Sequence, residues 1–525
     1  MNRDAGFPRR ADKGGALFPP DKEPMSATID LSEPMAGTRF RPVVPPPLKE
    51  PLGLFEFLRA ARKNPITTWM DAHFKLPVVA AEGAMGRITL VSDPALIRYL
   101  LIENPDGYRK DDLQRRVLAP GLGNGLLSAE GDEWRLQRRT LAPIFNARTV
   151  QGFSDAMNAA GARLGRRLVR RDGKRVDVAL EMTRVTLDVL ERTIFTQGLP
   201  SDPDALGRAI TRFLEAVGPI DPLDVFGVPD FVPRIGRLRA RPAGRFFAEV
   251  VDELIARRKA LMGRGEAPRD LLTLLLAAQD PETGNGLSDL AVKANIVTFI
   301  AAGHETTANS LTWALYCLSQ DPAAQARVEA EVDAAGPGDF AVERLPFTRA
   351  VIEEAMRLFP PVPFLSRQAV RDDRLGRIKV PRGSLVMVAP WVLHRHQLLW
   401  DDPEAFVPER FLPENRDAIP RFAYLPFGAG PRVCIGQSFS IQEAVIVLAH
   451  VVRAVRSRLP GGSPAGHAAP PGDAPAGARL ADGGRAAGVS GLTGSPCVLT
   501  LPERVSRVAL AEIGHEPRWS TPLLP

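Results

Sequence analysis

The chain has 525 residues, of which 45% are apolar, so it can bury a large core. Its net charge of +6 is mild for this length, and no basic run is interleaved with aromatic residues, which argues against nucleic-acid binding. Three widely spaced cysteines exclude a disulfide framework and a four-cysteine metal site, and they predict a reducing, cytoplasmic location. No run approaches 18 consecutive apolar residues, so we expect no transmembrane anchor.

The two ends of the chain differ in composition from its middle. Residues 1–48 are rich in proline and charge and predict a disordered extension, in which either of two methionines is a candidate start. Residues 49–459 contain no long polar linker and no repeat, so we expect one large domain there. Residues 460–496 are a Pro/Gly/Ala-rich low-complexity segment, and 497–525 form an atypical C-terminal segment that begins with a candidate strand, "CVLTLPERV".

Between these ends, helical patterns outnumber strand patterns. The alternation in "GRITLVSD" predicts a strand over 86–93, and "PALIRYLLIENP" predicts a helix over 94–105. Helix-period patterns then dominate from about 130 to 358, short strands follow within 377–390, and a helix is expected over 438–455. The order predicts a mainly α protein with small β-sheets, in the α+β class.

One cysteine stands in a loop that is built for close backbone approach, "FGAGPRVCIG" at 427–436. Three glycines surround Cys434 and permit a tight bend, and both the N–H groups of the bend and the following helix favour a thiolate. A thiolate beside a flat surface is what an axial haem ligand requires, and Arg432 is placed to meet a carboxylate at the edge of that group. The alternative is an inert cysteine in a turn.

The stretch "AAGHETTANS" at 301–310 places polar residues inside a long apolar helix pattern. A local widening of the helix at Gly303 would open a groove for dioxygen and water, where Glu305 and Thr306 would relay protons. The alternative is a structural turn in which the Thr306 hydroxyl bonds back to the carbonyl of Ala302.

The cysteine loop resembles the signature of the cytochrome P-450 family, the haem-thiolate monooxygenases. It fits Phe-x-x-Gly-x-Arg-x-Cys-x-Gly through Phe427, Gly430, Arg432, Cys434 and Gly436. The stretch at 301–310 is similar to the Ala-Gly-x-(Asp/Glu)-Thr-(Thr/Ser) motif of the family, and the resemblance covers roughly residues 50–456. It implies the cytochrome P-450 fold, with haem b between a long central helix and the loop that supplies Cys434 as the iron ligand.

The resemblance also assigns residues that hold the haem or brace its loop. Trp134 and Arg138 share a helix face at i,i+4, and the family uses this pair, with Arg367 and Arg432, for the haem propionates; the alternative is an exposed basic helix. A second set forms a buried charge network that braces the cysteine loop in the family; here it comprises Glu354, Arg357 and Arg410. Without the resemblance, the first two would be only an exposed helix pair.

The implied reaction inserts one atom of dioxygen into a lipophilic substrate by hydroxylation or epoxidation. We expect electrons from a separate ferredoxin and ferredoxin reductase, because the segment after Cys434 is short and no dinucleotide fingerprint occurs in the chain. Arg135 and Arg139 are candidate docking residues. The resemblance also points to an apolar substrate pocket, which in this sequence comprises Phe299, Ala302, Val362, Phe364 and Leu365.

Three other functions compete with this interpretation. A haem-thiolate peroxygenase driven by hydrogen peroxide would have less need of Glu305 and Thr306. A catalytically impaired haem-binding relative is suggested by the altered C-terminal segment. A cysteine hydrolase is the most distant alternative, because nothing marks a histidine partner for Cys434.

Overall fold

The computed structural model describes residues 39–456 apart from 84–85, 172–174, 195, 197–227, 229–231, 233 and 337, and it also describes the strand at 498–500. Within these residues, the helices are α1 (Leu54–Lys63), α2 (Pro94–Arg98), α3 (Asp112–Leu122), α4 (Gly131–Leu141), α5 (Ala147–Gln151), α6 (Ser154–Val169), α7 (Val178–Ile194), α10 (Ile235–Gly263), α11 (Leu271–Ala277), α12 (Asp289–Gln320), α13 (Pro322–Ala334), α14 (Pro346–Leu358), α15 (Pro390–Leu393) and α16 (Gln437–Arg456).

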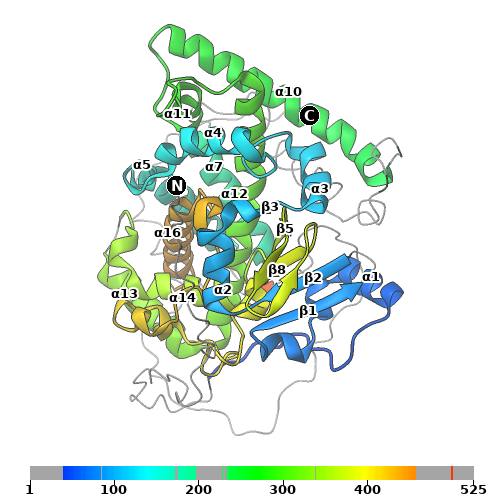
Figure 1. Cartoon of the computed structure of the whole chain (residues 1–525). Coiled ribbons are helices and arrows are strands. Elements are labelled where there is room, and N and C mark those ends of the chain that lie inside the picture. Colours follow the sequence, from blue (N-terminus) through cyan, green and yellow to red (C-terminus); the bar gives the residue numbers. More distant parts are fainter. Residues whose placement is uncertain are drawn as a thin grey trace, which may run out of the picture. The chain divides into compact units, whose positions relative to one another are not determined.

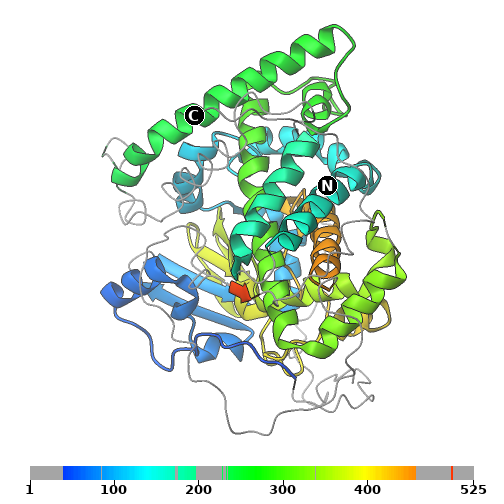
Figure 2. The ribbon, with the colours of Figure 1, turned by 180° about the vertical axis from the view of Figure 1, so that it is seen from behind.

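The long helix α12 runs through the middle of the helical layer (Figures 1 and 2). Its first turn is fixed by Ser288, whose side chain accepts a hydrogen bond from the N–H of Ala291. Apolar side chains are buried along most of its length, as expected for a helix that is surrounded by others. Helices α7, α14 and α16 all pack against it, so α12 is the common wall of the core.

The main sheet lies beside the helices and has the strand order β1 (Val78–Gly83), β2 (Gly86–Val91), β8 (Leu385–Val388), β5 (Leu365–Ala369) and β3 (Tyr108–Arg109) (Figure 1). Strands β2 and β8 are parallel, and the remaining pairs are antiparallel. Two-stranded sheets are formed by β6 (Asp373–Leu375) with β7 (Ile378–Val380), and by β4 (Arg175–Asp177) with β9 (Val498–Thr500). Strand β5, which carries Arg367, pairs with the edge strand β3.

Helix α16 follows the cysteine loop and forms part of the core. It packs against α6, α12 and α14, and the side chains from Ala444 to Ala449 are all buried. Among the described residues it is the one helix long and apolar enough to span a membrane by length and composition. Because 61% of that window is buried inside the protein, the hydrophobicity of α16 is accounted for by the core.

The predicted fold class, mainly α with small sheets, is confirmed. The expected strand over 86–93 is β2, and the helix over 438–455 is α16. The expected helix over 94–105 is shorter, because α2 gives way to a π-helical turn at Tyr99–Glu103. Residues 1–38 and 460–496 lie outside the described residues, so the predicted domain boundaries stay predictions. Of the C-terminal candidate strand "CVLTLPERV", the structure describes Val498–Thr500, which form β9.

Candidate functional site

The cysteine loop is a tight turn that presses against a neighbouring segment. The N–H of Cys434 donates to the carbonyl of Phe427 at 2.9 Å, which closes the turn. Gly430 has φ +75°, and a Cβ built there would lie 2.0 Å from the carbonyl oxygen of Leu101. Both the backbone angle and the close approach therefore require glycine at this position. Gly436 is placed differently: its carbonyl accepts from the N–H of Ser440 in the first turn of α16.

The side chain of Cys434 is accessible, although it lies deep within the fold. Burial raises the pKa of its thiol, while a hydrogen bond from the backbone of Gly436 and the positive charge of Arg138 lower it. The thiol is therefore desolvated by the surrounding protein and yet remains accessible. The N–H donor and the nearby guanidinium stabilise the thiolate that a metal ligand requires.

Glu305 and Thr306, called the acid–threonine pair below, lie on a continuous helical turn of α12. The Thr306 hydroxyl donates to the carbonyl of Ala302 at 2.7 Å, as the structural alternative predicted. The expected widening at Gly303 is wrong, because α12 is unbroken from Asp289 to Gln320. Gly303 instead faces a side chain of α7, and a Cβ there would contact Leu190 at 3.4 Å. That distance is an ordinary van der Waals contact, so packing against α7 does not require glycine at this position.

Glu305 is half-buried, and its environment favours the protonated form of its carboxyl more than water does. Burial raises the pKa of its carboxyl. Next along α12, the hydroxyls of Thr307 and Ser440 are 3.1 Å apart, and this contact joins α12 to the first turns of α16. The acid–threonine pair is therefore next to a point where α12 meets the helix that leaves the cysteine loop.

Sequence reasoning missed Glu443, a second buried carboxyl near this junction. It lies on α16, burial raises its pKa well above the ordinary value, and the Thr307 hydroxyl opposes that shift. Its Oε1 has no hydrogen-bond partner within the described part of the chain. A glutamate inside the apolar run "SIQEAVIVLAHVV" is the sequence signal that could have found it.

Two of the predicted propionate-binding cations, Arg138 and Arg367, are partly withdrawn from solvent and have no directly paired carboxylate among the residues described. Burial lowers the pKa of Arg138 on α4, and it lowers the pKa of Arg367 on β5 to about 10. Arg367 donates to the carbonyl of Ser366, but neither guanidinium forms an ion pair with a carboxylate among the residues described. Desolvating a cation that has no directly paired carboxylate is costly, so these positions favour an anionic ligand.

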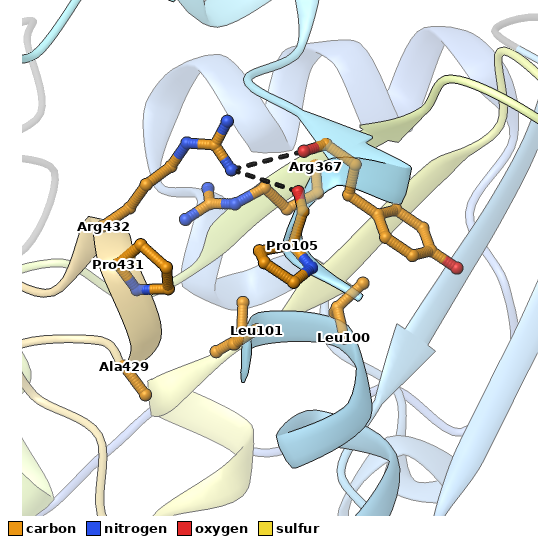
Figure 3. Close-up of a pocket in the computed structure, with 8 residues that line it drawn as sticks. Leu100, Leu101, Pro105, Arg367, Ala429, Pro431 and Arg432 are labelled. Carbon is orange, nitrogen blue, oxygen red and sulfur yellow. Dashed lines mark hydrogen bonds between the residues drawn. The ribbon is translucent and has the colours of Figure 1, made fainter. Parts of the chain in front are cut away.

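Arg432 lies beside Arg367 and is extensively bonded (Figure 3). It donates to the carbonyl of Tyr108 at 3.2 Å and to the carboxylate of Glu130 at 2.9 Å. Its guanidinium lies 5.0 Å from the ring centroid of Trp134, the buried tryptophan of α4. The structure thus brings Trp134, Arg432 and Arg367 together, and it supplies Arg432 with a protein carboxylate that sequence reasoning did not foresee.

The three predicted bracing residues also come together. Glu354 and Arg357, both completely buried on α14, form a two-pronged ion pair with N···O distances of 2.7 and 2.8 Å. Arg410 approaches the same carboxylate at 3.6 Å. Arg357 also donates to the backbone carbonyls of His394 and Ala405, so the network fixes the segment that leads toward the cysteine loop.

Other predicted residues are placed less favourably. The interpretation of Arg135 and Arg139 as docking residues loses its basis, because each already pairs with two carboxylates: Asp106 and Asp132 for Arg135, and Asp280 and Glu282 for Arg139. Among the apolar candidates, Phe299 packs edge-on against Phe145 with ring centroids 5.1 Å apart. Ala302 and Val362 are exposed, and Phe364 and Leu365 are partly exposed. Their roles as pocket residues stay predictions.

The residues present fit a haem. An accessible thiol with thiolate-stabilising neighbours suits an iron ligand, and the partly desolvated guanidiniums of Arg138 and Arg367, which form no direct ion pair among the described residues, suit the two carboxylates at the edge of the ring. Fold and site together define a haem-thiolate protein.

Comparison with known proteins agrees with this class. Residues 45–466 match the family described as Cytochrome P450. Two enzymes of Streptomyces melanosporofaciens, Cyclooctatin synthase and Cyclooctat-9-en-7-ol 5-monooxygenase, are each 32% identical, over 71% of this chain and 82% and 81% of their own lengths. The crystal structure of the cytochrome P450DA heme domain superposes with a TM-score of 0.67 at 28% identity, over 79% of this chain and 91% of that one.

The chain therefore belongs to the cytochrome P450 family. It is an oxidoreductase of the monooxygenase class, and its cofactor is haem b held by a cysteine thiolate. The fold and reaction class expected from the motifs are confirmed.

Proposed function

We propose that this chain hydroxylates or epoxidises a lipophilic organic molecule, such as a fatty acid or a terpenoid, with electrons from a separate ferredoxin and ferredoxin reductase. The observation that carries the proposal is the acid–threonine pair on α12. The accessible residues that precede it on the same helix are apolar. Ala302 is exposed one turn before Thr306, and Phe299 is half-buried one turn earlier. An apolar surface beside a carboxyl whose pKa is raised by burial suits an apolar substrate.

The haem, when bound, supplies dioxygen activation and the oxidising power, and the side chains of α12 manage protons beside it. Because burial raises its pKa, the Glu305 carboxyl binds a proton more readily than an exposed glutamate, and it can pass that proton inward. Because the Thr306 hydroxyl donates to the carbonyl of Ala302, its lone pairs are free to accept a hydrogen bond from water or from the carboxyl. The two groups together form a short proton path.

A separate electron donor is supported by charge. The net charge of +6 favours association with an acidic protein. The relatives named above do not specify the donor, and the paired Arg135 and Arg139 no longer mark its position. A cytoplasmic location, expected from the sparse cysteines, also stays a prediction, which cell fractionation would test.

The proposal is tested by supplying electrons and peroxide separately to the haem-loaded protein. A plant or bacterial ferredoxin with its reductase and NADPH, under ¹⁸O₂, should yield one labelled oxygen per product from substrates chosen by their spin-state shift. Thr306→Ala should lower the product formed per NADPH consumed. Thr312→Ala is the matched control, because Thr312 makes the same back-bond on α12, to Ala308 at 2.7 Å. Product that forms with hydrogen peroxide but not with the ferredoxin system would contradict the proposal.

A further inference from the structure

Glu130 holds a position that neither the motifs nor the family resemblance assign. It immediately precedes α4, in extended backbone, and its side chain is 17% exposed. One carboxylate oxygen accepts from the backbone N–H of Lys110 at 3.1 Å, and the other accepts from Arg432 at 2.9 Å. A single side chain thus joins three segments: the residue after β3, the start of α4, and the cysteine loop.

The surroundings of Glu130 are rich in cations. Lys110 is buried, and its ammonium donates to the carbonyls of Leu126 and Ala129 at 3.0 and 2.6 Å. Burial lowers the pKa of Lys110 to about 8, and the charge of Glu130 opposes that shift. Glu130 likewise opposes the lowered pKa of Arg367. Its carboxylate is therefore the direct ion-pair partner of Arg432 and a more distant negative charge for Lys110 and Arg367.

Arg432 is the link from this cluster to the thiol. It stands two residues before Cys434, within the 3-10 turn Gly430–Arg432. Besides Glu130, its partners are the backbone carbonyls of Tyr108 and Pro105, which are neutral (Figure 3). Loss of the Glu130 charge would leave a partly buried guanidinium uncompensated beside the cysteine loop.

We propose that Glu130 is a positioning residue for Arg432. It fixes the Arg432 guanidinium and neutralises its charge, and it thereby sets the electrostatic potential that the Cys434 loop imposes on the haem. A negative charge near a redox centre disfavours the addition of an electron, so removing it makes the centre easier to reduce. The effect is a property of the Glu130–Arg432 pair and is separate from the choice of substrate or electron donor.

The test compares the ferrous fraction of the haem-loaded protein at one fixed potential, in a mediated spectroelectrochemical titration. Glu130→Gln keeps the size and the acceptor for the Lys110 N–H but removes the charge, and the ferrous-to-ferric ratio should rise about fourfold. Asp132→Asn is the matched control. Asp132 lies two residues away, and its side chain is 99% exposed, so water and salt should screen the loss of its charge.

A Glu130→Gln ratio equal to that of Asp132→Asn would overturn the proposal. If Glu130→Gln does not retain haem, Glu130→Asp decides, because it keeps the charge on a shorter side chain. The proposal expects Glu130→Asp to stay within about twofold of the wild-type ratio. A ratio raised about fourfold or more in Glu130→Asp would show that the charge is not what matters.

Discussion

Replacing Arg357 by methionine should destabilise the fold severely. The guanidinium makes two hydrogen bonds to Glu354, at 2.7 and 2.8 Å, and three to the backbone carbonyls of His394, Pro403 and Ala405. Both charged side chains are completely buried. Methionine fills a similar space but leaves the carboxylate of Glu354 with the N–H of Val407 and a distant Arg410.

The magnitude follows from these contacts. Removing one partner of a buried ion pair costs about 3–5 kcal/mol, because the remaining charge is uncompensated. Each of the three carbonyls loses a charge-assisted donor, which adds roughly 1 kcal/mol or more apiece where water cannot reach it. The total is about 6 kcal/mol or more, a large share of the 5–15 kcal/mol that is typical of folded domains.

Urea unfolding of the haem-loaded protein, followed by circular dichroism and by the haem absorption band, would measure this loss. Arg349→Met is the matched control on the same helix. Arg349 is 47% exposed and pairs with Glu353, which keeps a second partner in Arg416, so the control should change stability by less than about 1 kcal/mol. An Arg357→Met variant as stable as this control would refute the view that the network holds the fold.

Three further predictions concern the loop, the cations and the pH dependence. Gly430→Ala should prevent stable haem binding, measured by the haem absorption of the purified protein, because the added Cβ would meet the Leu101 carbonyl 2.0 Å away. Arg367→Gln should weaken haem affinity by about tenfold or more, because it removes one charge-assisted hydrogen bond to the haem. Haem transfer to apomyoglobin measures this affinity, and transfer equal to that of the wild type would show that Arg367 does not bind the haem. Burial and nearby arginines lower the pKa of His450 to about 4 in the folded protein. As pH falls, the unfolded chain therefore binds a proton at His450 before the folded protein does. The free energy of unfolding should therefore fall by up to about 3 kcal/mol between about pH 6.5 and 4. The control is His450→Gln, whose side chain can still donate to Asn158. In urea titrations at several pH values, this variant should show a smaller loss of stability with falling pH.

Features encoded in neighbouring residues could be predicted from the sequence. The bend around Cys434 and the helix after it follow from local glycines and a continuous apolar run, and the structure shows both. The helix α12 was predicted from its periodicity for the same reason. Spacing alone also placed Glu354 and Arg357 on one helical face, where they do form an ion pair.

Features that depend on partners distant in the chain could not be predicted. Glu130 and Arg432 are 302 residues apart, and no local pattern connects them. Arg135 and Arg139 looked like free cations because Asp106 and Asp280 reach them only in the folded chain. Gly303 suggested a widened helix, but the side chain it faces belongs to α7. In each case tertiary packing decided the role of the residue.

The central claim is that Cys434 presents a thiolate to a haem held between its loop and α12. The most direct measurement is the absorption difference spectrum of the dithionite-reduced protein with carbon monoxide. A strongly red-shifted Soret band, lost in Cys434→Ala, is the predicted result. A haem spectrum without that band, or one unchanged in Cys434→Ala, would contradict the claim.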